Sequence, residues 1–277
     1  MVMKKSIFKV DVRLENHYMM RLKVLTPVLI IAVISIFSCT SEESVQYMPL
    51  STESELAREF YETGTLAFDQ LRWHLAMHNL ELAVKEDPDF FMAHFWMYFI
   101  SGKSPKKTAE KALRSGASLN DAEKLIKQAF KYLLDGQNEK VVENLNEAID
   151  LYPMDPNVYK ILYFLQFQYL KDIEGATKTL YSAIEVQPDY AFAYNYLGYA
   201  LMESEEMNKA EEALNMYIRL APNTANPYDS KGDYFMNTEQ YDKAYESYMK
   251  AFEIDSGFSI SEKKAKKAKS LLEKLSE

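Results

Sequence analysis

The chain of 277 residues has little cysteine, glycine or proline, with counts of 1, 8 and 9, but it has 20 tyrosines and 15 phenylalanines. A single cysteine excludes an intrachain disulfide framework and a zinc site built from several thiolates. The shortage of glycine disfavours both the many tight turns of an all-β fold and the phosphate-binding loops of nucleotide enzymes. With 48% hydrophobic and 26% charged residues, the composition is that of a folded globular chain.

Basic residues are also in deficit, because 32 lysines and arginines face 41 acidic residues and leave a formal net charge of −9. This balance disfavours a nucleic-acid partner, since few cations are available to neutralise phosphates. His74 and His78 have the spacing of two metal ligands on a helix, but no third ligand is evident. The carboxylates show no pairing that indicates acid–base catalysis. We therefore expect no catalytic residues, no metal site and no cofactor.

Long apolar runs are absent except at residues 24–37, near the start of the chain. A helix that spans a bilayer needs about 20 apolar residues, so this run is short for a permanent anchor. It fits the hydrophobic region of a secretory signal, because the basic residues Arg21 and Lys23 precede it. We expect residues 1–38 to be a signal peptide, and a start at Met20 would give it an ordinary length.

The single cysteine, Cys39, follows the apolar run directly. Residues 36–39 resemble a lipobox, in which the cysteine is lipidated and becomes the new N-terminus. The acidic residues 40–43 resemble signals of lipoproteins in some Gram-negative groups. These resemblances imply a lipoprotein of the bacterial cell envelope, at the periplasmic or surface side of the outer membrane. Residues 39–54 are expected to form the lipidated cysteine and a flexible acidic tether. An uncleaved anchor and a buried core helix are the alternatives.

The rest of the chain repeats one pattern, in which alanine, apolar, acidic, apolar and polar residues precede a marker residue. The markers are Pro88, Pro153, Pro188, Pro222 and Ser256. Their spacings of 65, 35, 34 and 34 residues indicate a unit of about 34 residues, with two units in the first interval. Mostly small residues stand twelve positions before the markers, at Ala76, Val141, Ala176, Ala210 and Ala244. A second series of small residues stands earlier in the unit, at Gly64, Ala129, Gly198 and Gly232. Phe164 takes the corresponding position in the remaining unit and breaks the series.

The pattern predicts two antiparallel helices in each unit. Small residues allow the helices to cross closely, and a proline cannot continue the second helix. These features resemble the tetratricopeptide repeat, which implies an all-α, right-handed solenoid of helix-turn-helix repeats over residues 55–258. The expected units are 57–90, a degenerate 91–121, 122–155, 156–190, 191–224 and 225–258. Residues 259–277 are expected to form a capping helix with outward-facing lysines, and a membrane-surface helix is the alternative.

In proteins of this family, the first helix of each unit lines a concave groove. The resemblance therefore assigns a stripe of positions with i, i+4, i+7 spacing to that groove. The candidate partner-binding residues are Tyr61, Phe68, Phe95, Phe99, Phe130, Phe164, Phe167 and Tyr199. The stripe becomes acidic at Asp229 and Asp233, and Lys160 is its only basic residue. The rings either anchor a peptide or helix, or pack within the solenoid.

We therefore expect a non-catalytic protein–protein interaction scaffold, anchored in the bacterial envelope by its lipid, that binds a peptide or protein in its concave groove. One alternative is an accessory lipoprotein of an outer-membrane transporter that captures glycans or nutrients on its aromatic rings. The other is a cytoplasmic adaptor that is anchored to the membrane by its apolar N-terminus.

Overall fold

The computed structural model describes residues 47–101 and 105–275. They lie in one compact unit, Glu43–Glu277, and among them are thirteen α-helices, one π-helical turn and no strand. None of the helices described is both long and apolar enough to cross a membrane. The predicted signal peptide and the lipidated Cys39 lie outside the described residues.

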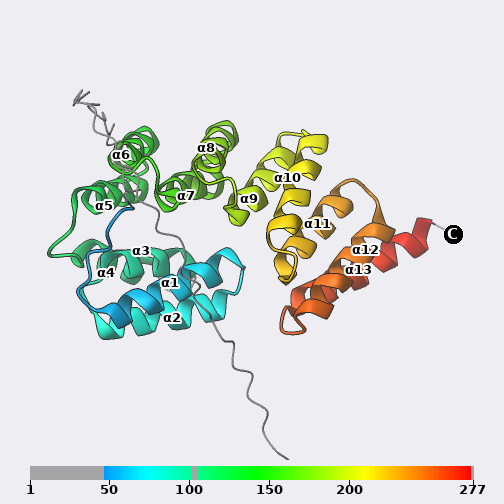
Figure 1. Cartoon of the computed structure of the whole chain (residues 1–277), viewed down its shortest axis with the longest axis horizontal. Helices are drawn as coiled ribbons and strands as arrows, with labels where there is room; N and C mark the ends of the chain where they lie inside the picture. Colours follow the sequence, from blue (N-terminus) through cyan, green and yellow to red (C-terminus); the bar gives the residue numbers. More distant parts are fainter. Residues whose placement is uncertain (1–46, 102–104, 276–277) are drawn as a thin grey trace, which may run out of the picture. The chain divides into compact units, whose positions relative to one another are not determined.

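The helices follow one another as adjacent pairs, which confirms the predicted all-α stack (Figure 1). The first three pairs are α1 (Glu55–Asp69) with α2 (Trp73–Glu86), α3 (Phe91–Ile100) with α4 (Pro105–Arg114), and α5 (Asp121–Leu134) with α6 (Asn138–Leu151). The next three are α7 (Pro156–Leu165) with α8 (Ile173–Val186), α9 (Ala191–Glu203) with α10 (Met207–Leu220), and α11 (Ala225–Asn237) with α12 (Tyr241–Ile254). The last helix, α13 (Ser259–Leu275), packs on α12.

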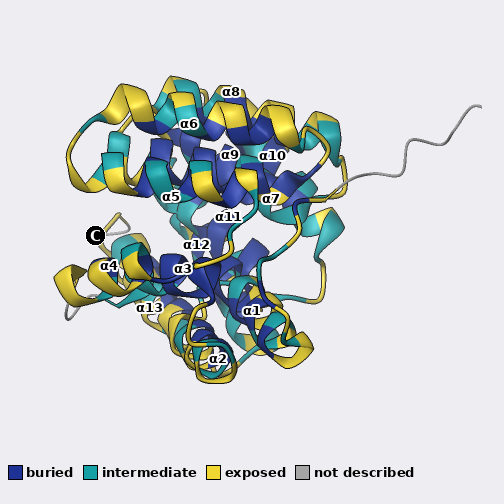
Figure 2. Cartoon of the chain, turned by 90° about the vertical axis from the view of Figure 1, so that its left-hand side faces the viewer, coloured by how far each residue is buried: buried dark blue, intermediate teal, exposed yellow. Residues whose placement is uncertain are grey.

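The two helices of a pair approach most closely at the small residues that recur in the sequence. A Cβ atom added to Gly198 would lie 2.6 Å from the side chain of Leu214, and one added to Gly232 would lie 2.4 Å from the ring of Tyr248. A larger side chain at either position would therefore push the helices apart. In Figure 2 the buried residues lie on the helix faces turned toward neighbouring helices, and exposed residues follow the outer faces of α6 and α8.

The fourth repeat contains one residue more than its neighbours, because Pro188 follows Pro153 by 35 positions instead of 34. A π-helical turn, η1 (Gln166–Leu170), continues α7 and accommodates this residue. The side chain of Gln166 is buried and accepts a hydrogen bond of 2.8 Å from the hydroxyl of Thr179. On α7, just before this turn, Phe164 packs against rings of α1 and α3.

Residues 47–54 pack on the repeats and do not form the flexible tether that their composition predicts. The backbone N–H of Met48 donates to Asp155 Oδ2 at 2.9 Å, and Met48 itself is buried. Further hydrogen bonds join Ser51 to Glu123, Asn120 to Pro49, and Thr52 to Asp87. The tether prediction failed here because the polar groups of this segment find partners on the helix ends. Residues 39–46 lie outside the described residues.

Three histidines lie in the described part of the chain. His74 and His78 are exposed on α2. His94 is buried on α3, and its Nε2 atom lies 3.0 Å from the carbonyl oxygen of Pro88. Burial lowers the pKa of His94, so its imidazole is neutral near neutral pH.

Candidate functional site

An aromatic pocket of about 510 Å³ lies where α1, α3, α7 and α9 come together with the turn η1. Proteins commonly bind ligands and peptide side chains in hollows of this size that have mostly apolar walls. We call this hollow the aromatic pocket. It is lined by Phe68, Leu71, Trp73, Phe99, Phe164, Phe167, Gln168, Tyr169, Asn195, Tyr196 and Tyr199.

The eight aromatic residues of the predicted stripe fall into two groups: rings that line the aromatic pocket and rings that are buried away from it. Phe99, Phe167 and Tyr199 line the aromatic pocket and are half-buried, so they are accessible to a ligand. Phe68 and Phe164 also line it, but only 1% and 6% of their surfaces are exposed. The remaining three, Tyr61, Phe95 and Phe130, are buried and lie outside the aromatic pocket. Three of the eight rings are therefore accessible in the aromatic pocket, and the other five are buried within the protein.

The ring of Phe164 lies at the centre of the buried cluster behind the pocket. Its centroid is 5.3 Å from that of Phe68, 5.5 Å from that of Trp96 and 5.2 Å from that of Phe99. Tilted and edge-to-face ring pairs of this kind stabilise by about 0.5–1.5 kcal/mol beyond the area that they bury. The cluster joins the first, second and fourth repeats, and it therefore holds the pocket walls in place.

Two accessible rings of the pocket lie outside the predicted stripe. Trp73 begins α2, is 45% exposed and meets Phe68 edge-on at 5.3 Å. Tyr169 lies in η1, 5.0 Å from the ring of Phe99, and burial raises the pKa of Tyr169 to about 12. The predicted stripe was restricted to the first helix of each unit and to regular α-helical spacing. It therefore missed Trp73, which lies on α2, and Tyr169, which lies in the π-helical turn. The only feature of the sequence that could have indicated η1 is the spacing of 35 residues, one more than usual, between Pro153 and Pro188.

A polar group without a partner lies among these rings. Asn195 is 3% exposed, and its Oδ1 atom has no hydrogen-bond partner within the described part of the chain. A buried acceptor without a partner costs about 1–3 kcal/mol.

The single basic residue of the stripe is already paired inside the protein. Lys160 Nζ lies 2.6 Å from Asp69 Oδ2, and the two side chains are 4% and 5% exposed. The same nitrogen lies 5.2 Å from the ring centroid of Trp96. Burial raises the pKa of Asp69, and the charge of Lys160 opposes that rise. Lys160 therefore stabilises the contact between α1 and α7 and does not present a free charge to a ligand.

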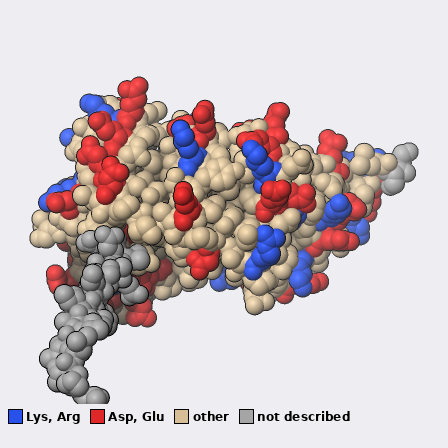
Figure 3. All heavy atoms as spheres, turned by 45° about the horizontal axis from the view of Figure 1, so that its top comes forward, with Lys and Arg blue, Asp and Glu red and all other residues tan. Residues whose placement is uncertain are grey.

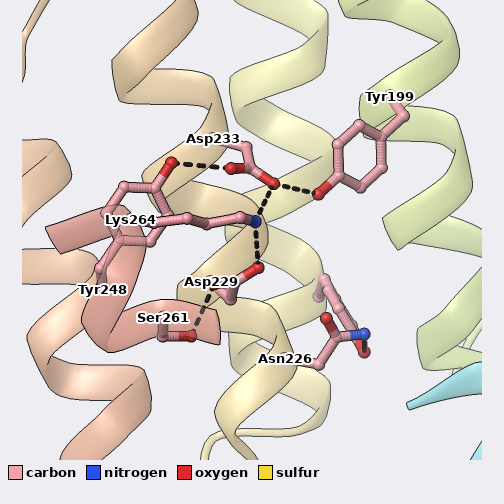
Figure 4. A network of polar contacts seen from close by, with 8 residues as sticks. Tyr199, Asn226, Asp229, Asp233, Tyr248, Ser261 and Lys264 are labelled. Atoms are coloured by element: carbon pink, nitrogen blue, oxygen red, sulfur yellow. Dashed lines mark hydrogen bonds and ion pairs between the residues drawn. The ribbon is translucent and has the colours of Figure 1, made fainter. Parts of the chain in front are cut away.

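The acidic end of the stripe is covered by the last helix (Figure 4). Lys264 Nζ lies 2.6 Å from Asp229 Oδ2 and 2.8 Å from Asp233 Oδ2. The hydroxyls of Tyr199 and Tyr248 each donate to Asp233 at 2.7 Å. The prediction that the lysines of this helix face outward is therefore wrong for Lys264. Its ammonium group pairs with the buried carboxylate of Asp229 and the half-buried carboxylate of Asp233.

The charges in this network compensate one another. Burial raises the pKa of Asp229, while Lys264 and Ser261 lower it. Burial lowers the pKa of Lys264, but the two carboxylates outweigh this effect and leave the pKa raised. The last repeat therefore presents less negative charge than its sequence indicates. On the face drawn in Figure 3, basic residues lie scattered among acidic ones and do not gather into a patch.

Comparison with known proteins places one repeat in a family. Residues 225–258, which comprise α11 and α12, match the sequence model of the tetratricopeptide repeat. No curated protein matches the chain. A crystal structure of MamA protein is 21% identical, covers 73% of this chain and 93% of its own, and has a TM-score of 0.42. A second crystal structure of MamA is 27% identical, with coverages of 56% and 94% and a TM-score of 0.45.

The crystal structure of the APC/C hetero-tetramer Cut9–Hcn1 is also similar, at 17% identity. It covers 76% of this chain and 42% of its own, with a TM-score of 0.47. The chain is thus a stack of tetratricopeptide-like helix pairs, and its pair at residues 225–258 is a tetratricopeptide repeat.

Proposed function

We propose that the chain is a non-catalytic scaffold, anchored by a lipid in the bacterial envelope, that binds a peptide or protein segment in the aromatic pocket. The observation that carries this proposal is the set of accessible rings that line the aromatic pocket, Trp73, Phe99, Phe167, Tyr169 and Tyr199. Rings such as Trp73 and Phe167 supply apolar contact area for the side chains of a bound segment. Tetratricopeptide repeats act as protein-interaction modules, which agrees with this use of the pocket.

The proposed anchor rests on the apolar residues 24–37 and on Cys39 directly after them. Two acyl chains hold a protein on a membrane stably, whereas one chain binds only marginally. Tyr47 stands eight positions after Cys39, and eight residues span at most about 29 Å when fully extended. A lipid on Cys39 would therefore keep the repeats close to the bilayer surface.

The anchor is tested by replacing the cysteine. In bacteria grown with a labelled fatty acid, the native chain should carry the label and sediment with membranes. Cys39→Ser should lose both properties, because no thiol remains to be acylated. The matched control is Ser41→Ala, two positions after the cysteine, which should keep the label. A Cys39→Ser chain that still carries the label would refute the lipid anchor.

The pocket is tested by photocrosslinking in intact membranes. A photoreactive phenylalanine in place of Phe167, a half-buried wall of the aromatic pocket, should become crosslinked to one protein partner. The matched control is the same group in place of Tyr181, which is 47% exposed on α8 and does not line the pocket. Equal crosslinking from both positions, or crosslinking from Tyr181 alone, would contradict binding in the pocket.

A further inference from the structure

The turn between α1 and α2 lies against the last repeat, far from it in the sequence. Leu71 packs with Ala225 and Phe258. The amide of Asn226 donates to the carbonyl oxygen of Asp69 at 3.4 Å. Arg72 forms an ion pair with Asp255. These contacts combine an apolar anchor, a backbone hydrogen bond and a salt bridge, as a bound peptide would do. We call residues 69–73 the inserted turn.

The residue types at this turn support a binding role. In five helix pairs, a residue with positive φ stands two positions before the second helix, at Leu71, Gly136, Lys171, Glu205 and Glu239. Of these five residues, only Leu71 has an apolar side chain. The left-handed backbone disfavours leucine, whereas glycine adopts it freely. The contact with the last repeat therefore explains why leucine is found here.

The inserted turn also separates two hollows. The aromatic pocket lies on one side of it. A second hollow, of about 600 Å³, lies on the other side and is lined by residues of α11, α13 and the loop before α13. Leu71 and Trp73 line both hollows. Leu71 and Trp73 therefore form a wall that the two hollows share.

We propose that the surface around Ala225, Phe258 and Asp255 is a docking site for a peptide that presents a leucine followed by an arginine. The inserted turn occupies this site in the free chain, and a partner with the same residues replaces it. Ala225 and Phe258 hold the leucine, and Asp255 pairs with the arginine. This inference rests on the proposed function, because it names a sequence feature of the peptide or protein partner.

The two side chains that the inserted turn places on the last repeat, Leu71 and Arg72, are both partly exposed. The side chains of Arg72 and Asp255 are 43% and 24% exposed, and ion pairs near the surface contribute little to stability. Leu71 is only half-buried. The inserted turn competes with an external peptide for the docking site. The apparent affinity for the peptide is therefore lower than the intrinsic affinity, in proportion to the fraction of chains in which the site is free.

The test adds a fluorescent peptide with the sequence of residues 66–75 to the full chain and measures its anisotropy. Leu71→Asn keeps a residue that tolerates positive φ but removes the apolar anchor, so it should open the site. The peptide should bind this variant about tenfold or more tightly than the native chain, because the internal competitor is weakened. Glu205→Asn changes the equivalent turn of α9 and α10, and it should bind the peptide as the native chain does.

A second change tests the contacts themselves. Adding Asp255→Asn to Leu71→Asn should weaken peptide binding several-fold, and so should an alanine at the arginine of the peptide. Equal affinity for the native and Leu71→Asn chains, no binding to either, or indifference to Asp255 would overturn the proposal. If Leu71→Asn does not fold, Arg72→Ala serves as the opening variant.

These outcomes are distinct from those of the proposed function. The peptide assay uses neither the membrane nor a natural partner. A partner crosslinked at Phe167 together with failed peptide binding would refute only the docking site. Peptide binding without any crosslinked partner would refute only the proposed function.

Discussion

Lys160→Met should lower the free energy of unfolding by about 3–5 kcal/mol, because it leaves the carboxylate of Asp69 buried without its partner. Methionine keeps most of the side-chain volume, so the loss reports the charge rather than a cavity. Asp69 Oδ1 has no hydrogen-bond partner in the described part of the chain, so it offers no second contact to compensate for the lost lysine. Urea denaturation followed by circular dichroism measures the change.

Two variants separate this effect from a general loss of lysine. Lys178→Met, at an exposed position of α8, should change stability by less than about 0.5 kcal/mol. Combining Lys160→Met with Asp69→Asn should recover much of the loss, because no buried charge then remains. A loss below about 1 kcal/mol for Lys160→Met alone would mean that Asp69 reaches water in the folded chain.

Phe164→Ala should also be strongly destabilising, by about 3–5 kcal/mol, because it removes the ring at the centre of the buried cluster. The sequence left open whether Phe164 anchors a ligand or packs within the solenoid. Because its ring is buried among other rings, we expect its loss to affect the fold. Thermal unfolding of the purified chain measures the loss.

The comparison with Phe167→Ala makes this result specific. Phe167 is half-buried in the wall of the aromatic pocket, so its removal should cost about 1 kcal/mol or less and mainly weaken crosslinking to a partner. If both variants lost the same stability, the division of the rings into accessible and buried ones would be wrong.

The fold could be predicted because its determinants are local and periodic. Prolines end the second helices, and small residues such as Gly198 and Gly232 mark where two neighbouring helices cross. Both signals repeat at nearly constant intervals, and each depends only on residues within one hairpin. The helix pairs could therefore be recognised from one sequence.

The site could be predicted only in part, because its details depend on contacts between distant repeats. Phe164 is buried by rings of α1 and α3, and no spacing within its own unit indicates this. Lys264 faces inward because Asp229 and Asp233 lie opposite it on α11. The inserted turn meets a repeat that lies 157 residues further along the chain. These contacts are made with other repeats, so the residue spacing within one helix does not indicate them.

The attachment of residues 47–52 has a mechanical consequence. Hydrogen bonds join this segment to Glu123 near the start of α5 and to Asp155 at the start of α7. A force that pulls on the N-terminal side of the chain therefore acts first on these bonds, and it reaches α1 only after they break. The third and fourth repeats would bear such a load, and the first hairpin would be shielded from it.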